Sequence, residues 1–308
     1  MTNQSSRDQS FTEKTKIAVI GVGALGRHHA RILAGLNECE LVAVAEPNEH
    51  IGQPIAEQHG CRWVADYHEC LNEIDAVSIV VPTVVHHKIG VECLEMGLSV
   101  LMEKPLAKTV TEATELVDAA KRNDALLQVG HIERFNPVTP VARKMLGTPR
   151  YIKGERLSPY AFRSTDIGVI HDLMIHDIDL VLSFVNAPVQ SVDAFGISIL
   201  GENEDSVQAR LYFENGCIAD LSANRVNPEF KRAMQIWSDT GSVDIDFNSQ
   251  KVTGYSPSEQ LLFGTSPLEK SRQPGADIDQ LKQDIFGKYI QVDEPEVQQN
   301  VDALTAEL

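Results

Sequence analysis

The spacing of apolar and polar residues divides the chain into two parts that meet near Pro137. In the first part, short apolar runs alternate with segments whose apolar residues recur at helical intervals. The runs are mostly continuous and rich in β-branched residues, which is typical of parallel strands covered on both faces. They are Ile17–Ile20, Leu41–Ala45, Ala76–Val81, Leu98–Met102 and Leu126–Gly130. The first part therefore predicts an α/β domain with a doubly wound parallel sheet, whose ligands lie beyond the carboxyl ends of the strands.

The helices between these runs are predicted from spacing and from end signals. A polar helix is expected to be interrupted by Pro54, and residues 66–73 predict one short helix. Residues 83–96 have helical spacing and end at Gly97, which accepts the left-handed conformation after a helix. The stretch that begins at Thr109 has a capping-box pattern and opens another helix.

The pattern changes from Tyr151 onward. Residues 151–157 predict a strand and residues 166–185 one long helix, and after these the strand patterns follow without intervening helices. Asn-Gly at 215 and Thr-Gly at 240 predict tight turns between paired strands. The second part therefore predicts an α+β domain on a large mixed or antiparallel sheet, with little to be inferred beyond Ser256. We expect a disordered tail over 1–15, a first domain over 16–137 and a second over 138–308.

A glycine-rich turn follows the first predicted strand without a spare residue. Its sequence is Gly21-Val22-Gly23-Ala24-Leu25-Gly26. Gly21 allows a sharp turn, Gly23 leaves room for a pyrophosphate, and Gly26 lets the next helix pack close to the strand. The N–H groups of that helix's first turn then face the phosphates. The turn predicts a dinucleotide site, although an ordinary glycine-rich turn has the same short pattern.

Glu46 ends the second predicted strand, twenty residues after Gly26. A carboxylate there accepts hydrogen bonds from the adenosine ribose and repels a 2′-phosphate, and Pro47 and Asn48 supply no arginine to offset that repulsion. NAD is therefore expected in preference to NADP. A solvated loop carboxylate is the alternative interpretation.

A polar stripe runs along the helix predicted for residues 166–185. Asp172, His176, Asp179 and Ser183 fall on one narrow face, while apolar residues fill most of the rest. Buried polar groups need partners, so the stripe should face either polar side chains or a cleft. A structural His–Asp pair is the alternative to a catalytic one. Lys104 leaves a similar choice between a solvated loop lysine, the more common case, and a catalytic lysine, and its place on the cofactor edge of the sheet strengthens the second interpretation.

Composition narrows the range of partners. Lys plus Arg number 27 and Asp plus Glu 44, which gives a formal net charge of −17 and argues against nucleic acid or an anionic membrane as a partner. The five cysteines have no CxxC spacing, so neither a disulfide framework nor a metal site is expected, and a cytoplasmic location fits. Residues 1–15 have no apolar core and do not predict a signal peptide.

Five motifs together resemble the Gfo/Idh/MocA oxidoreductases. They are GVGALG at 21–26, VVPT at 80–83 followed by His86, EKP at 103–105, VGHIERFNP at 129–137 and DLMIH at 172–176. Their order and spacing are similar to the family's over roughly residues 16–255. The resemblance implies a reversible, NAD-dependent hydride transfer at the C–OH of a sugar or cyclitol, without a metal.

The resemblance also implies roles for individual residues. Lys104 matches a catalytic lysine, Asp172 an aspartate that orients the substrate, and His176 a general acid/base. The residues that match cofactor-binding positions are Gly21, Gly23, Ala24, Leu25, Glu46, Pro82, Thr83, His86, Glu103, Lys104 and Arg134. A cis peptide bond between Lys104 and Pro105 is also expected, because the intrinsic penalty for X–Pro is only about 0.5–1 kcal/mol.

Residues 154–179 are similar to those of family members that act on nucleotide-linked amino sugars. This implies that a UDP-linked N-acetylamino sugar is oxidised to a keto sugar, with contacts from Arg156, Ser158, Tyr160 and Arg163. Structural ion pairs are the alternative role for these residues. A free-sugar or inositol dehydrogenase and a non-catalytic NAD-binding regulator are the alternative functions. A homo-oligomer, dimer or tetramer, is expected by analogy, and family chains usually continue past a segment like 303–307, so a truncated chain is expected.

Overall fold

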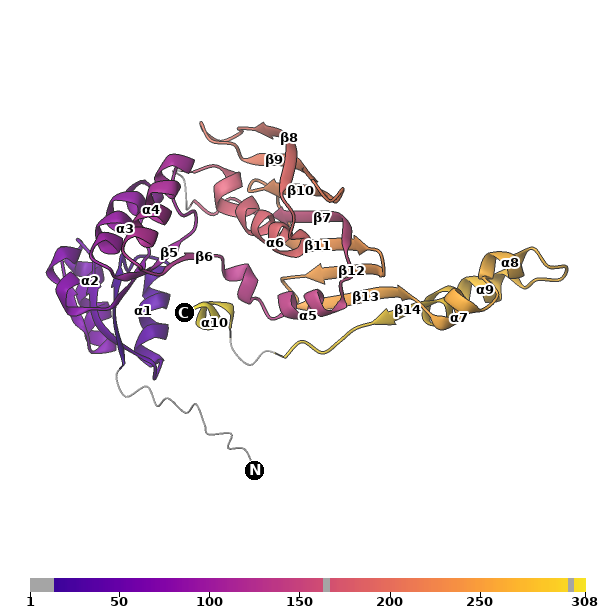
Figure 1. The fold of residues 1–308 in the computed structure, drawn as a ribbon, viewed down its shortest axis with the longest axis horizontal. Coiled ribbons are helices and arrows are strands. Elements are labelled where there is room, and N and C mark those ends of the chain that lie inside the picture. Colours follow the sequence, from indigo (N-terminus) through magenta and orange to yellow (C-terminus); the bar gives the residue numbers. More distant parts are fainter. Residues whose placement is uncertain (1–13, 163–166, 299–301) are drawn as a thin grey trace, which may run out of the picture. The chain divides into compact units, whose positions relative to one another are not determined.

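The computed structural model describes residues 14–162, 167–298 and 302–308. These residues belong to two compact units, one that runs from residue 14 to 130 with Glu307–Leu308, and one formed by the described residues between 131 and 306 (Figure 1). The division after Gly130 lies ahead of the boundary expected at Pro137. The described parts include no helix that is both long and apolar enough to cross a membrane.

The first unit is built on a six-stranded sheet. Its strand order is β3-β2-β1-β4-β5-β6, and all neighbouring strands are parallel. The strands are β1 (Thr15–Ile20), β2 (Cys39–Ala45), β3 (Arg62–Val64), β4 (Ala76–Ile79), β5 (Ser99–Glu103) and β6 (Leu127–Gly130). The predicted doubly wound parallel sheet is confirmed.

Helices cover both faces of this sheet (Figure 1). They are α1 (Gly26–Gly35), α2 (Glu49–His59), α3 (His86–Glu95) and α4 (Val110–Arg122). Successive residues of a strand point to opposite faces, so Val19 packs with α1 and α2 while Ala18 and Ile20 pack with α3 and α4. Burial on both sides explains why the strand patterns are continuous rather than alternating.

Several helix boundaries differ from the prediction. The helix α2 runs through Pro54 without interruption, and residues 66–73 form two 3₁₀ turns, η1 (Tyr67–Glu69) and η2 (Leu71–Glu73). The turn η3 (Thr83–Val85) precedes α3, and Gly97 has the expected left-handed φ of 78°. The capping box is confirmed, because Thr109 accepts from the Glu112 N–H and the Glu112 side chain accepts from the Thr109 N–H.

The second unit is built on an eight-stranded mixed sheet. Its order is β14-β13-β12-β11-β7-β10-β9-β8, in which β7 and β10 are parallel and the other pairs antiparallel. The strands are β7 (Pro149–Leu157), β8 (Val189–Ile197), β9 (Ser206–Phe213), β10 (Ile218–Asn224), β11 (Lys231–Ser238), β12 (Gly241–Asp246), β13 (Lys251–Pro257) and β14 (Ile290–Asp293). Both predicted hairpins, β9 with β10 and β11 with β12, are confirmed.

One face of this sheet packs against α5 (Val138–Met145) and α6 (Ile175–Val185). The long helix expected over 166–185 was predicted too long. The described helical segment starts with η5 (Ile170–Met174), a π-helical turn, and continues as α6 to Asn186, whose φ of 48° ends it. Asp166 lies outside the described residues. A short turn, η4 (Ile132–Phe135), opens the unit.

Residues beyond Ser256 form short elements that the sequence did not reveal. They are α7 (Glu259–Phe263), α8 (Pro267–Ser271), α9 (Ile278–Asp284) and η6 (Ile285–Tyr289), which extend from the ends of β13 and β14 (Figure 1). Helices of five to seven residues complete two turns at most, so they carry no repeating apolar pattern.

The helix α10 (Ala303–Glu307) ends with a buried carboxylate. The Glu307 residue is 6% exposed, and among the described residues neither carboxylate oxygen has a hydrogen-bond partner. Burial, and secondly the neighbouring Glu103, raises the pKa of Glu307 to about 8. In the folded protein Glu307 therefore keeps its proton up to about pH 8. In the unfolded chain the same carboxyl group has the usual Glu pKa of about 4.3 and loses its proton there.

The expected consequence is a protein that loses stability as pH rises from about 4 to about 8, because the folded state binds more protons than the unfolded state across this window. Glu307→Gln should raise the free energy of unfolding at pH 8 by about 2–4 kcal/mol and change it little at pH 4. Urea unfolding at both pH values measures this, with Glu296→Gln as the exposed control. Equal effects of the two substitutions at pH 8 would contradict the prediction.

Candidate functional site

A cavity of about 610 Å³ lies within the first unit, beside the carboxyl ends of β1, β2 and β4. It brings together four residues that the sequence assigned to the cofactor, Gly21, Gly23, Glu46 and Pro82. Ala24 and Leu25, which were assigned with them, are exposed at the start of α1 and are not among the residues that line the cavity.

The glycine turn has the geometry that a dinucleotide needs. Gly21 has a φ of +84°, and a Cβ there would lie 2.4 Å from the Val80 carbonyl oxygen. A Cβ on Gly26 would lie 1.9 Å from the Gly21 carbonyl oxygen, so no larger residue fits between turn and helix. Gly23 borders the cavity and has no atom within 4 Å of its Cβ position. The space beside Gly23 therefore fits a pyrophosphate close to the backbone.

Glu46 joins the glycine turn to the start of α2. Its carboxylate accepts from the Val22 N–H at 3.3 Å and from the Asn48 N–H at 3.2 Å, while its carbonyl oxygen accepts from Trp63 Nε1 at 2.9 Å. A carboxylate oxygen has two lone pairs, so each keeps acceptor capacity for a ribose hydroxyl. The position and the chemistry of Glu46 fit an NAD adenosine ribose.

Sequence reasoning missed several residues that line the same cavity, and three of them have long side chains. They are Ile51 of α2, Tyr67 of η1 and Lys88 of α3. Each lies in the first helical turns after a parallel strand. Those turns surround the edge of the sheet where ligands bind, so their position in the sequence was the signal that could have identified them. Lys88 places a cation on the cavity wall that the NAD argument did not include.

His86 has a different role from the predicted one. The side chain is 1% exposed; its Nδ1 lies 2.9 Å from the Pro105 carbonyl oxygen, and its Nε2 lies 2.9 Å from the Val81 carbonyl oxygen. Because the ring is buried between two backbone carbonyl oxygens and does not line the cavity, His86 connects two loops. Thr83, which was also assigned to the cofactor, is 9% exposed at the start of η3.

Glu103 and Lys104 lie at the carboxyl end of β5. Glu103 Oε2 accepts from the Lys104 N–H at 3.1 Å, and its Oε1 lies 3.2 Å from Nε2 of the buried His29. His29 Nδ1 in turn lies 2.9 Å from the Ser78 hydroxyl. Both carboxylate oxygens of Glu103 therefore contact protein groups, and one of them holds the backbone N–H of Lys104 in place. The predicted cis peptide bond between Lys104 and Pro105 is confirmed.

In the second unit, Asp172 and His176 lie one turn apart on the segment formed by η5 and α6. Asp172 is 8% exposed and His176 is half-buried. The other two residues of the predicted polar stripe contact arginines. Asp179 accepts two hydrogen bonds from Arg134, at 2.6 and 2.7 Å, and the Ser183 carbonyl oxygen accepts from Arg143 at 3.0 Å. Arg134, assigned to the cofactor by resemblance, is thus paired with Asp179.

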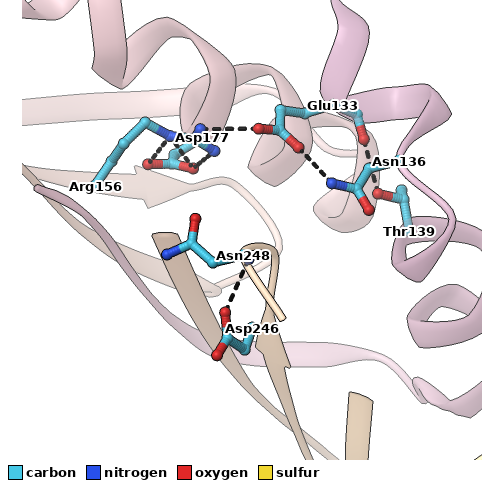
Figure 2. A network of polar contacts seen from close by, with 7 residues as sticks. All are labelled: Glu133, Asn136, Thr139, Arg156, Asp177, Asp246 and Asn248. Atoms are coloured by element: carbon cyan, nitrogen blue, oxygen red, sulfur yellow. Dashed lines mark hydrogen bonds and ion pairs between the residues drawn. The ribbon is translucent and has the colours of Figure 1, made fainter. Parts of the chain in front are cut away.

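Arg156 is a structural residue, which corrects its assignment to the substrate. Its side chain is 2% exposed, and its guanidinium donates to Asp177 and to Glu133 (Figure 2). A buried guanidinium with both partners in place has no face left for a diphosphate. Tyr160 is half-buried, with the Arg225 guanidinium carbon 5.4 Å from its ring centre, and Arg163 lies outside the described residues. In the part of the chain that the structure describes, no three His, Cys, Asp or Glu residues are grouped to hold a metal.

Gly23→Ala is expected to weaken NAD binding about tenfold or more without destabilising the protein, because the added methyl group meets no protein atom and enters the space beside the turn. Gly35→Ala, at the other end of α1 and equally open, is the matched control. Calorimetric titration with NAD⁺ and a thermal melt measure both variants. Equal NAD affinity in the two would contradict the proposed path of the pyrophosphate.

Glu46→Ser is expected to narrow the preference for NAD over NADP by at least about tenfold, because it removes both the ribose hydrogen bonds and the repulsion of a 2′-phosphate. Lys88 stays in the cavity and should favour the extra phosphate. Titration of both cofactors into both proteins gives the ratio. Tighter binding of NADP⁺ than NAD⁺ by the unaltered protein would refute the assignment.

Comparisons with known proteins identify the family of the chain. Residues 15–131 match the model of an oxidoreductase family with an NAD-binding Rossmann fold, and residues 141–244 match the GFO/IDH/MocA C-terminal domain. The UDP-N-acetylglucosamine 3-dehydrogenase of Acidithiobacillus ferrooxidans is 37% identical over 233 residues, which cover 75% of this chain and 74% of the relative. The scyllo-inositol 2-dehydrogenase (NAD(+)) of Bacillus subtilis is 30% identical over 70% of this chain and 68% of the relative.

Solved structures extend the likeness to most of the chain. The structure of the A. ferrooxidans UDP-N-acetylglucosamine 3-dehydrogenase covers 96% of this chain and 86% of that chain, with a TM-score of 0.81 and 31% identity. A myo-inositol 2-dehydrogenase of Lactobacillus plantarum, at 24% identity and a TM-score of 0.70, covers 76% of each chain and shares the fold. The chain therefore belongs to the Gfo/Idh/MocA family of oxidoreductases and is an NAD-dependent dehydrogenase of that family.

Proposed function

We propose that the protein oxidises a secondary alcohol of a UDP-linked N-acetylamino sugar, such as UDP-N-acetylglucosamine, to a keto sugar. The observation that carries this proposal is the coverage of 96% of this chain by the A. ferrooxidans structure, together with the 37% identity to the same relative. The inositol dehydrogenases share less of the sequence, and the 30% identity of the B. subtilis enzyme keeps a cyclitol as the second candidate.

The proton chemistry is assigned to three residues of this chain. His176 accepts the proton of the reacting hydroxyl, because an imidazole with an unperturbed pKa of about 6.5 is a base near neutral pH. Asp172, one turn earlier, orients that hydroxyl or the imidazole. Lys104 stabilises the negative charge that develops on the oxygen. NAD⁺, when bound, accepts the hydrogen with its electron pair from the carbinol carbon.

The remaining roles follow from the first unit. The turn at Gly21 and Gly23 holds the cofactor's phosphates and Glu46 its ribose, so the loop of Lys104 lies on the same sheet edge as the cofactor site. A homo-oligomer and a cytoplasmic location stay predictions. Sedimentation of the purified protein tests the first of these.

A substrate panel tests the proposed function. The purified protein is mixed with NAD⁺ and one of UDP-N-acetylglucosamine, its uronic acid, UDP-glucose, myo-inositol or glucose. NADH absorbance and the product mass are then followed. Oxidation of the UDP-N-acetylamino sugars, with a product two mass units lighter, is the expected result. Turnover of myo-inositol or glucose alone would overturn the sugar-nucleotide assignment and favour the second candidate.

A further inference from the structure

Three elements of the second unit meet at a buried ion cluster. Arg156 of β7 donates from Nε and Nη2 to Asp177 of α6, at 2.8–3.1 Å, and from Nη1 to Glu133 of η4 at 2.9 Å (Figure 2). The three side chains are 2%, 3% and 8% exposed. Arg156 therefore links the central sheet, the helix that carries His176 and the turn that opens the unit.

Glu133 is itself held in place by its neighbours. Asn136 Nδ2 donates to Glu133 Oε2 at 3.0 Å, and the Thr139 hydroxyl donates to the Glu133 carbonyl oxygen at 2.8 Å (Figure 2). The next residue, Arg134, makes the bidentate contact with Asp179. Two consecutive residues of η4 thus hold α6 at two points, Asp177 through Arg156 and Asp179 directly.

Stability alone does not account for such a cluster. A buried ion pair gains about as much from attraction as it loses from desolvation, and apolar residues of the same volume are often equally stabilising or better. Burial raises the pKa of Asp177 even with Arg156 beside it, so the cost of desolvation offsets part of the attraction between the two side chains. What ionic contacts add over apolar packing is direction, because a guanidinium binds a carboxylate in one plane and one register.

The contact with Asp177 bears directly on His176. The two residues are adjacent on α6, so their side chains leave the helix about 100° apart, and fixing one fixes the direction of the other. We propose that Arg156, held by Glu133 and Asp177, is a positioning residue that sets the rotation of α6 and thereby the direction of Asp172 and His176. This inference rests on the proposed function in assigning the proton chemistry to His176.

Conservative variants separate positioning from folding. Asp177→Asn keeps one oxygen for Arg156 Nε and Nη2, Arg156→Lys keeps the charge but not the planar contact, and Glu133→Gln leaves the Arg156–Asp177 pair intact. Asp220→Asn is the matched control. It alters the bidentate Arg210–Asp220 pair, which lies in the same sheet at 2.6 and 2.7 Å.

The first measurement is steady-state kinetics with NAD⁺ and UDP-N-acetylglucosamine, and with myo-inositol in parallel. Asp177→Asn and Arg156→Lys should lower kcat about 10–100-fold, because small displacements of a reacting group have effects of that size. The KM for the sugar should change less than about threefold and the Kd for NAD⁺ less than about twofold, since ground-state binding is left in place. The kcat of Glu133→Gln should lie between the kcat values of these two variants and that of the Asp220→Asn control.

The second measurement needs no substrate. NMR titration of ¹⁵N-histidine-labelled protein, with His176 assigned from His176→Gln, gives the pKa of its imidazole. The charged groups around Asp177 are Arg156, Glu133 and Arg232, with Asp172 and Asp179 on its own helical segment. Arg156→Lys keeps the positive charge beside Asp177 but loses the planar contact. A shift of the His176 pKa by about 0.5 unit in this variant therefore reports a change in side-chain direction, while Asp220→Asn should leave the pKa unchanged.

The outcomes distinguish this inference from the proposed function. A kcat within about twofold of the unaltered enzyme in both Asp177→Asn and Arg156→Lys, with normal thermal melts, overturns the positioning role. If neither sugar is turned over by the unaltered protein, the proposed function fails, and the NMR titration alone decides the inference. An unchanged His176 pKa in Arg156→Lys then overturns it. If Asp177→Asn does not fold, Arg156→Lys decides both measurements by the same criteria.

Discussion

His176→Ala is expected to lower kcat by about 10²–10⁴-fold, the usual contribution of a positioned general base. The affinity for NAD⁺ should barely change, because the cofactor cavity is lined by residues of the first unit. In the unaltered enzyme, kcat/KM should rise with pH through the titration of His176, since only the neutral imidazole accepts a proton. This rise should be lost in the variant. Stopped-flow and steady-state rates from about pH 5 to 9 measure both effects.

His171→Ala is the matched control for this variant. His171 lies on η5 in the same helical segment and is exposed, so its loss should leave kcat and the pH profile unchanged. A His176→Ala enzyme with near-normal kcat and an unaltered pH profile would remove His176 as the base. Lys104 in its neutral form would then be the better candidate.

Lys104→Ala is expected to lower kcat by at least about 10²-fold, the usual loss when a donor to a developing oxyanion is removed. The backbone N–H of residue 104 keeps its bond to Glu103 in the variant, and Glu103 keeps its contact with His29, so the loop should hold its conformation. Since the charge develops in the transition state, kcat and kcat/KM should fall together.

Lys108→Ala, an exposed lysine in the segment that follows, controls for the loss of a positive charge. Rates at saturating substrate, NAD⁺ titrations and thermal melts should be measured on both variants. Equal rates in the two would exclude a catalytic role for Lys104. If Lys104→Ala removed the rise of kcat/KM with pH while His176→Ala kept it, the roles of the two residues would be exchanged.

The sequence by itself determined the parallel sheet and the cofactor loop, because both depend on neighbours along the chain. Continuous apolar runs specify strands buried on both faces, and the spacing from Gly21 to Gly26 fixes a turn in which Cβ atoms would meet the backbone. Glu46 could be assigned for the same reason, since it directly ends β2. The Thr109 cap and the left-handed Gly97 are likewise local features.

Only the tertiary structure decided the roles of His86 and Arg156. Both belong to patterns that also suit ligand contacts, and in each case the deciding partner is distant in the chain. His86 meets the carbonyl of Pro105, and Arg156 meets Asp177, 21 residues later, and Glu133, 23 residues earlier. The side chain of a strand residue points to one of the two faces of the sheet. For Arg156, the packing of α6 and η4 on one face decides which partners the side chain meets.

The polar stripe was determined partly by the sequence and partly by the tertiary structure. Helical periodicity placed Asp172, His176 and Asp179 on one face, since that depends on spacing alone. The arginine that satisfies Asp179 comes from η4, and the buried Asp177 lies off the stripe and was not singled out. Periodicity gives the direction of a side chain from its own helix, whereas its partner depends on which segment packs there, and that is decided only when the chain is folded.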